Sequence, residues 1–313
     1  MKIVFMGTPD FAVPAVDALK KAGHDIVLCV TQPDKAAGRG NKVKYSEVKE
    51  WAIENDVPVF QPVRIKNEES VEELKKYPAD VFVVAAFGQI LPEDVLKMPR
   101  LGCVNIHASL LPKYRGASPI QWAVLNGDKT SGVTIMQMGV GLDDGDILLQ
   151  EEVELDKNET GGSLFDRLSE VGAKLIVEAL PKLDSGEITP IPQDESKATK
   201  VGMIRKALGK ISFMEPAEKI ERYVRGLYPW PGAYTFLDGK TVKIHSADVT
   251  DLPEDAPKDL SNGTVVYSDK DTLIIKTSDK CLSVKELQLE GKKRMSISDF
   301  LRGHKIETGA KFG

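Results

Sequence analysis

Hydrophobic positions recur with two different spacings over the first two-thirds of the chain. Short apolar runs predict buried strands, and the amphipathic stretches between them predict helices. The predicted strands are Lys2–Met6, Asp25–Val30, Asp80–Ala86, Cys103–Ile106, Val133–Gln137 and Ile147–Glu151. The predicted helices are about Pro14–Ala22, Glu47–Asn55, Ser70–Tyr77, Pro92–Lys97, Pro119–Asn126 and Ser163–Leu183. This alternation is typical of a doubly wound, mostly parallel α/β sheet with helices on both faces, a Rossmann-like fold.

The pattern changes after Ser185. The segment 186–204 combines Gly and Pro with a polar run, which predicts a linker. One predicted helix, Pro216–Gly226, and five short β runs follow the linker. The β runs are Ala233–Leu237, Thr241–Ala247, Gly263–Tyr267, Thr272–Thr277 and Cys281–Leu289. Short strands separated by turn signals favour a small OB-like β-barrel, so we predict domains at residues 1–185 and 205–313.

Two polar residues stand at the end of one predicted strand. Because Val104 and Ile106 are apolar, Asn105 and His107 share the opposite face and come out together at the carboxyl end of the strand. Ligands bind at the carboxyl ends of strands in such sheets, which directs the search to the segments after Ile106 and after Gln137. An amide donor and a titratable imidazole aimed at one point can hold the oxygen of a tetrahedral intermediate and move a proton. Most Asn-x-His pairs are only satisfied polar groups, so the pair alone does not decide.

The second segment, residues 138–146, is acidic. It carries Asp143, Asp144 and Asp146 within four positions, and its glycines allow a tight loop. One carboxylate directed at His107 would favour the cationic imidazole and fix the ring. The twelve-residue spacing of a calcium-binding EF-hand is absent. A solvated acidic turn remains the alternative.

Two segments near the amino terminus bear on ligands. Gly7-Thr8-Pro9-Asp10-Phe11 follows the first strand but is not Gly-x-Gly-x-x-Gly, which disfavours a dinucleotide site. The segment Gln32–Lys44 is Gly-rich and basic in a half that is otherwise acidic. Such a segment is either a solvated connection or an arm that reaches for phosphates, and its charge against the local trend favours the arm.

Charge divides the chain unevenly. Its net charge is −5, but residues 1–196 carry 21 Lys and Arg against 31 Asp and Glu, whereas residues 197–313 carry 21 against 16. The basic second part suits either a polyanionic partner or a solvated face. No apolar run is long enough to span a membrane, and the three separated cysteines form neither a disulfide framework nor a zinc cluster. We therefore expect a cytoplasmic protein.

Together these segments resemble the folate-dependent formyltransferases, and among them the methionyl-tRNA branch. Asn105–Pro112 with Arg115-Gly116-Ala117 resembles the family signature, and Leu142-Asp143-x-Gly145-Asp146 resembles its second motif. Gly7–Ala12, the basic segment Gln32–Lys44 and Trp230–Ala233 resemble features of the tRNA-dependent branch. The resemblance runs over essentially the whole chain, with the motifs in order.

The resemblance implies a role for each matching residue. It implies a catalytic trio of Asn105, His107 and Asp143. It implies that folate contacts Ser109, Leu110, Leu111 and Pro112, with Phe87, Gln89, Ile90 and Leu91 around the pterin end. It implies that tRNA meets Lys35, Arg39, Lys42 and Lys44, and we add Lys206 and Lys210 from the basic second domain. Two departures stand out, because Gly139 replaces a more usual acidic residue and Lys35-Ala36-Ala37 and Tyr45 replace positions that more often hold Pro.

The implied activity is transfer of the formyl group of 10-formyltetrahydrofolate to the α-amine of methionyl initiator tRNA, by a monomer that needs no metal. One alternative is the same chemistry on a small amine, either glycinamide ribonucleotide or an amino sugar. The basic second domain counts against glycinamide ribonucleotide as the acceptor. An amino-sugar enzyme could keep a second domain, so only the basic segment Gln32–Lys44 distinguishes that alternative from the tRNA enzyme. A tRNA-binding module without catalysis is a further alternative, but it leaves Asn105, His107 and Asp143 unexplained.

Overall fold

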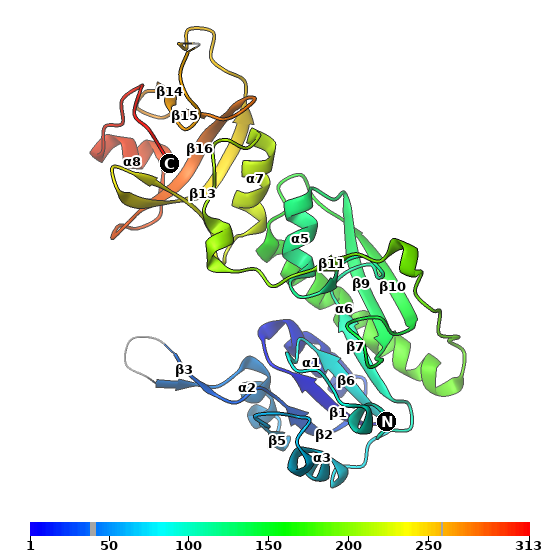
Figure 1. Ribbon diagram of the computed structural model, residues 1–313. Helices are drawn as coiled ribbons and strands as arrows, with labels where there is room; N and C mark the ends of the chain where they lie inside the picture. Colours follow the sequence, from blue (N-terminus) through cyan, green and yellow to red (C-terminus); the bar gives the residue numbers. More distant parts are fainter. Residues whose placement is uncertain (38–41, 258) are drawn as a thin grey trace. The chain divides into compact units, whose positions relative to one another are not determined.

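The computed structural model describes residues 1–37, 42–257 and 259–313, with the backbone alone described at 35–37 and 42–43. The chain forms two compact units (Figure 1). The first comprises residues 1–119, 130–154 and 165–201, and the second comprises residues 120–129, 155–164 and 202–313. No helix of the described residues is long and apolar enough to cross a membrane.

The first unit is built on a seven-stranded sheet. Its strands, in spatial order, are β10 (Ile147–Glu154), β9 (Thr130–Gln137), β7 (Cys103–His107), β6 (Val81–Ala85), β1 (Lys2–Gly7), β2 (Asp25–Val30) and β5 (Val59–Phe60). The pairs from β7 through β5 are parallel, so the predicted mostly parallel fold is confirmed. From β1 the chain first builds one side of the sheet and then returns to β6 on the other side. The carboxyl ends of β1 and β6 therefore flank a point where the strand order reverses, which is where such sheets bind ligands.

Helices pack against this sheet. They are α1 (Val13–Lys21), α2 (Glu47–Glu54), α3 (Glu68–Lys75), α4 (Glu93–Leu96) and most of α6 (Gly161–Ser185), with a short turn η1 (Asp10–Ala12) before α1. Ser46 caps α2 by accepting a hydrogen bond from the Lys49 amide, as its position before the helix leads one to expect. One core cluster joins β1, β2, β6, α3 and α4 through residues such as Met6, Leu28, Leu74, Phe82 and Val95.

One strand of this sheet corrects the sequence reasoning. Strand β9 runs antiparallel to β7, with Val104 opposite Gln137 and His107 opposite Thr134. The segment after Gln137 thus starts at the amino end of β7, and the rule about carboxyl ends was wrong for it. The direction of a strand in a sheet cannot be predicted from a short apolar run, because it depends on how the strand pairs with its neighbours. The loop 138–146 nevertheless folds back toward His107, as described below.

The second unit contains an antiparallel sheet. Its strands, in spatial order, are β12 (Ala233–Leu237), β13 (Lys240–Thr250), β16 (Cys281–Leu289), β15 (Leu273–Lys276) and β14 (Val265–Ser268), and β17 (Met295–Ser296) pairs with β16. Helices α7 (Ala217–Gly226) and α8 (Ile297–Gly303) supply Ile220, Val224 and Phe300 to its core. Helix α5 (Pro119–Asn126) also contributes to this unit, since Leu125 packs with Ile204 and Leu227.

The last residues of the chain close this sheet. Phe312 bridges Leu237 on edge strand β12, and Lys311 bridges Thr264 beside edge strand β14. One segment therefore hydrogen-bonds to both edges, which removes the exposed edges that an open sheet would present. The five predicted strands are confirmed, whereas α8 and the closing tail were not predicted.

Candidate active site

Strand β7 carries the two polar residues predicted to act together. Asn105 lies beside Val84 of β6 and Met136 of β9, and His107 ends the strand opposite Thr134. Only 9% of Asn105 and 6% of His107 is exposed. Alternation along the strand puts both side chains on one face, as predicted. Two polar side chains are thus nearly buried at the strand's carboxyl end, where burial must be compensated by partners.

The amide of Asn105 has no such partner in the part of the chain that the structure describes. Among the described residues, no group hydrogen-bonds to its side chain, although nine-tenths of the residue is buried. An amide offers two N–H donors and one acceptor. Among the described residues, the side-chain nitrogen or oxygen that is sealed from solvent without a partner is Thr235 Oγ1, so the Asn105 amide still reaches solvent. The amide is therefore open to a ligand oxygen that accepts from it.

His107 is held from both sides. Its Nε2 lies 3.0 Å from the carbonyl oxygen of Tyr114. Since a carbonyl can only accept, Nε2 carries the proton and donates. Its Nδ1 faces Asp143, with 3.8 Å between Nδ1 and Oδ2, which is an ion-pair distance but longer than a hydrogen bond. The ring is therefore fixed, and Nδ1 remains available for proton movement.

The acidic loop 138–146 presents one of its three carboxylates to His107. Asp143 does so, and its Oδ2 accepts a hydrogen bond of 2.7 Å from the Gly116 amide. Asp144 is exposed. Gly145 cannot be replaced without distortion, since an added Cβ would lie 1.8 Å from the Gln137 carbonyl oxygen. The backbone of Gly145 therefore packs directly against the end of β9.

Left-handed backbone conformations gather in these segments. Of six residues other than glycine with positive φ in the described chain, four are Ala86, Tyr114, Ser118 and Asp143, with φ of 48°, 61°, 62° and 50°. Each such residue costs on the order of 1 kcal/mol or more. Ala86 follows β6, Tyr114 and Ser118 follow β7, and Asp143 lies in the acidic loop, so all four mark the same region as Asn105 and His107.

The segment predicted to contact folate after β7 is anchored by one buried hydroxyl. Thr134 Oγ1 accepts from the Leu111 amide at 3.0 Å and from Gln150 Nε2 at 2.8 Å, and donates to the Ser109 carbonyl at 2.6 Å. Ser109 itself is 1% exposed and donates to the Lys113 carbonyl, and Leu111 is 3% exposed. Leu110 and Pro112 are half-buried. The segment is a fixed wall, and Leu110 and Pro112 are its more accessible side chains.

The second predicted folate segment follows β6. Phe87 and Leu91 are buried in the core cluster beneath the sheet edge. The side chain of Gln89 accepts from the Ile65 amide at 2.7 Å and donates to the Pro62 carbonyl at 3.0 Å. Ile90 is 77% exposed. Of these four, only Ile90 has a side chain that stands largely free for a ligand.

The basic segment forms a hairpin of β3 (Lys35–Ala37) and β4 (Lys42–Lys44), with Lys35 opposite Lys44 in register. Arg39 lies outside the described residues, and of Lys35 and Lys42 only the backbone is described. Lys44 pairs with Glu47 at 2.7 Å. Of the four basic residues predicted to meet tRNA in this segment, the structure therefore describes the side chain of Lys44 alone.

The foot of the hairpin is pinned by residues that the sequence reasoning missed. Lys49 pairs with Asp34 Oδ2 and reaches Gln61 Oε1 at 2.8 Å, and Gln61 Nε2 donates to Asp34 Oδ1 at 2.9 Å. Lys49 Nζ also lies 4.0 Å from the centre of the Tyr45 ring. Hydrogen bonds from Lys49 and Gln61 hold the pKa of the Asp34 carboxyl below its usual range. The sequence signal that could have pointed to this network is Pro33-Asp34, which stands directly before the basic, Gly-rich run.

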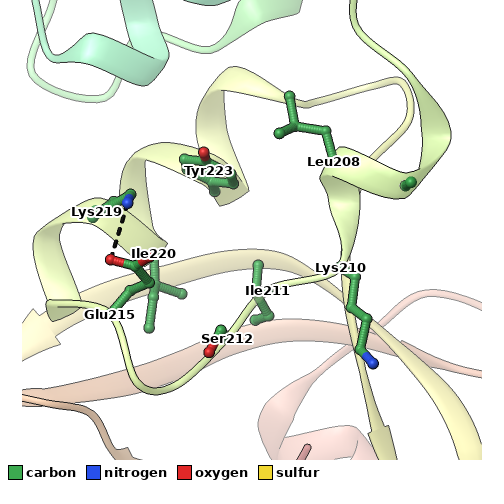
Figure 2. Close-up of a pocket in the computed structure, with 9 residues that line it drawn as sticks. Leu208, Lys210, Ile211, Ser212, Glu215, Lys219, Ile220 and Tyr223 are labelled. Carbon is green, nitrogen blue, oxygen red and sulfur yellow. Dashed lines mark ion pairs between the residues drawn. The ribbon is translucent and has the colours of Figure 1, made fainter.

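The two lysines predicted in the second unit are exposed. Lys206 lies in the turn η3 (Lys206–Gly209), and Lys210 Nζ lies 5.3 Å from the centre of the Phe236 ring. Lys210 also borders a cavity of about 210 Å³. Figure 2 shows Tyr223 and Ile220 of α7 facing Leu208 and Ile211 across it. The residues that line the cavity belong to the second unit, and we assign it no role in the chemistry.

No described cysteine offers a reactive thiolate. Cys29 and Cys103 are buried, and burial raises the pKa of each thiol to about 12. Burial also raises the pKa of Cys281. No group of three or more His, Cys, Asp or Glu among the described side chains is placed to hold a metal ion.

Comparisons with known proteins cover both units. Residues 1–180 match the family described as Formyl transferase, and residues 203–305 match Formyl transferase, C-terminal domain. A methionyl-tRNA formyltransferase of Lachnospira eligens is 54% identical over 100% of both chains. Another, of Agathobacter rectalis, is 50% identical over 100% of this chain and 99% of its own. The chain belongs to the methionyl-tRNA formyltransferase family.

Membership in this family confirms the predicted resemblance. It does not favour the branches that formylate small amines. The fold is shared more widely: the structure of an N-formyltransferase from Helicobacter canadensis, in complex with folinic acid and dTDP-3-aminofucose, is 17% identical and covers 94% of this chain and 100% of its own, with a TM-score of 0.66. At that identity the likeness concerns the fold alone.

Proposed function

We propose that this member of the methionyl-tRNA formyltransferase family transfers the formyl group of 10-formyltetrahydrofolate to the α-amine of methionyl initiator tRNA. The product is N-formylmethionyl-tRNA, which starts protein synthesis. The observation that carries the proposal is the amide of Asn105, which has no hydrogen-bond partner among the described residues and shares a strand face with the fixed imidazole of His107. Relatives of this name match the chain over its full length.

The proposed reaction is an acyl transfer without a covalent enzyme intermediate. The α-amine attacks the formyl carbon, and the carbonyl electron pair moves onto oxygen. The Asn105 amide and the Nδ1–H of protonated His107 donate to this oxyanion, since Nε2 already donates to the Tyr114 carbonyl, and one donor contributes about 10²–10³ in rate. As the oxyanion collapses, the bond from carbon to N10 of the folate breaks. The proton lost by the amine ends on N10, and Asp143 with His107 assists that transfer.

The tetrahydrofolate carrier is proposed to lie along the carboxyl edge of β6 and β7. Leu110, Pro112 and Ile90 are the accessible side chains there, while Ser109, Leu111, Phe87, Gln89 and Leu91 hold the walls from within. Related folds take folate derivatives, as in the complex of the Helicobacter canadensis enzyme with folinic acid. The site after β6 also lies where the strand order reverses, which supports this placement.

The tRNA is proposed to meet two basic regions. The hairpin with Lys35, Arg39, Lys42 and Lys44 would position the 3′ end, and Lys206 and Lys210 would supply general phosphate attraction. In this division residues 1–185 are catalytic, 186–204 connect, and 205–313 bind tRNA. The protein would work in the cytoplasm as a monomer.

The proposal is tested by measuring formyl transfer from 10-formyltetrahydrofolate with three sets of acceptors. They are initiator tRNA charged with methionine, the same tRNA uncharged together with free methionine, and the small amines glycinamide ribonucleotide and a dTDP-linked amino sugar. We expect transfer to the charged tRNA alone. Efficient transfer to a small amine, with none to charged tRNA, would replace the proposal by the small-amine alternative.

A further inference from the structure

The segment 191–201, which we call the strap, crosses the acidic loop and the turn after β7. Ile191 and Ile147 exchange both backbone hydrogen bonds at one end. At the other end β11 (Lys200–Val201) pairs with β8 (Arg115–Gly116). This stretch was predicted to be part of a linker, yet it hydrogen-bonds at both ends and at several points between them to segments of the first unit.

Between these ends the strap binds both segments that hold His107. Tyr114, whose carbonyl accepts from His107 Nε2, donates its own amide to Thr199 Oγ1 at 2.8 Å. The Arg115 amide donates to the Thr199 carbonyl at 2.8 Å, and the Thr199 amide donates to the Pro112 carbonyl at 3.1 Å. One side of the imidazole is therefore positioned through the strap.

The other side is reached through Gln193. Its Nε2 donates to the Asp143 carbonyl at 2.8 Å and to the Gly145 carbonyl at 2.7 Å, so both N–H groups of the amide are used on the acidic loop. Its Oε1 accepts from Arg115 Nε at 2.9 Å. Every hydrogen-bonding group of this side chain joins the acidic loop to Arg115.

Arg115 is in turn fixed. Only 3% of it is exposed, and its two terminal nitrogens bind Glu195 Oε1 at 2.7 Å and Oε2 at 3.0 Å. A two-point pair of this kind sets the plane of the guanidinium as well as its position. The chain of contacts therefore runs from Glu195 through Arg115 and Gln193 to the backbone of Asp143.

We propose that Gln193 is a positioning residue, which fixes the acidic loop so that the Asp143 carboxylate faces His107 Nδ1. The inference rests on the proposed function, because it takes Asp143 and His107 as the reacting pair. Gln193 touches neither side chain. Its effect is on the backbone that sets their separation, and misplacement by about 1 Å can lower a rate about 100-fold.

The decisive measurement is a double-mutant cycle on the full-length chain with Gln193→Ala and Asp143→Asn, read as kcat at saturating folate and tRNA. We expect Gln193→Ala alone to lower kcat about 10- to 100-fold while the KM for tRNA stays within about threefold. In the Asp143→Asn background the same change should cost at most about threefold more, since both act through one carboxylate.

Gln193→Glu separates positioning from mere support of Arg115. The carboxylate still accepts from Arg115 but cannot donate to the two carbonyls, so positioning predicts a loss of kcat at least as large as with Ala. It has the same size as Gln, so it carries the test if Gln193→Ala does not fold. Lys197→Ala, on the exposed side of the strap, is the control and should keep normal kcat.

Three results would overturn the proposal. They are additive losses in the cycle, normal kcat for Gln193→Glu, and an equal loss for Lys197→Ala. An Asp143→Asn variant of normal activity would instead show that the proposed function fails at Asp143, and the strap proposal would fall with it. Additive losses with an impaired Asp143→Asn would leave the proposed function standing and remove only the role of Gln193.

Discussion

The acidic loop 138–146 and the basic hairpin 35–44 belong to the same unit and are held in opposite ways. The loop receives hydrogen bonds from Gly116 and Gln193 near its middle and is tied to the end of β9 at its base. The hairpin is pinned at its foot, where Lys49 and Gln61 hold Asp34. Catalysis needs one carboxylate at a set distance from one imidazole, whereas phosphate attraction depends on charge and reach. Changes in the loop should therefore alter kcat. Changes in the hairpin should mainly alter the binding of tRNA and the placement of its 3′ end.

The largest effect is expected for His107→Ala, which removes the group that the acidic loop is held to face. We expect kcat to fall about 1000-fold, since an oxyanion donor and a proton carrier are lost together. The melting temperature should be measured alongside, because the ring also donates to Tyr114. A folded variant with near-normal kcat would remove His107 from the chemistry.

The next largest effect separates two neighbouring carboxylates. Asp143→Asn should lower kcat about 10- to 100-fold, because the charge beside His107 Nδ1 is lost while the shape is kept. Asp144→Asn is the matched control, since Asp144 is exposed and lies outside this contact, and it should keep kcat within about twofold. Equal effects of the two changes would mean that the loop acts by its general charge.

A smaller effect is expected in the hairpin. Arg39→Ala should raise the KM for tRNA and lower kcat about tenfold at saturating tRNA, because the hairpin is proposed to position the 3′ end. Lys206→Ala should weaken binding modestly and reduce the slope of log affinity against log salt by about one at most, with kcat unchanged. Full recovery of kcat by Arg39→Ala at high tRNA would reduce the hairpin to a nonspecific electrostatic arm.

The smallest effect concerns the foot of the hairpin and pH. Because the pKa of Asp34 is held below its ordinary value in the folded chain, its ion pair stabilises the fold above that ordinary value, about 4. The contribution is lost as pH falls through the lower folded value. The free energy of unfolding of the wild type minus that of Asp34→Asn, from urea titrations, should be constant above about pH 5 and shrink below about pH 4. A difference independent of pH would contradict the pairing with Lys49.

The features that could be predicted are those that depend on the pattern of residues close together in the sequence. Alternation with Val104 and Ile106 put Asn105 and His107 on one face of β7, and the spacing of apolar runs gave the strands of both units. The choice of Asp143 among three carboxylates could not be predicted from residue spacing, because it depends on Gly116 and Gln193, which lie 27 and 50 positions away. Helix α8 could have been predicted from the sequence, since Ser296 and Asp299 form a capping pair at its start.

Other features leave almost no pattern in the sequence. The strap is held by backbone groups and by the side chains of Gln193, Glu195 and Thr199, residue types that are common in any polar connection. The tail that closes the second sheet consists of two bridges made by Lys311 and Phe312. The antiparallel direction of β9 is set by pairing with β7 and β10, and a short apolar run carries no direction.

The central claim is that Asn105, nearly buried and unpartnered among the described residues, is the donor kept for the reacting formyl oxygen. The most direct test is the single-turnover rate of formyl transfer for Asn105→Ala, with 10-formyltetrahydrofolate and methionyl initiator tRNA both saturating. Since no described residue hydrogen-bonds to this amide, the melting temperature should stay within about 3 °C. We predict that the rate falls by about 10²–10³. A rate within about twofold of the wild type, in a folded variant, would contradict the claim.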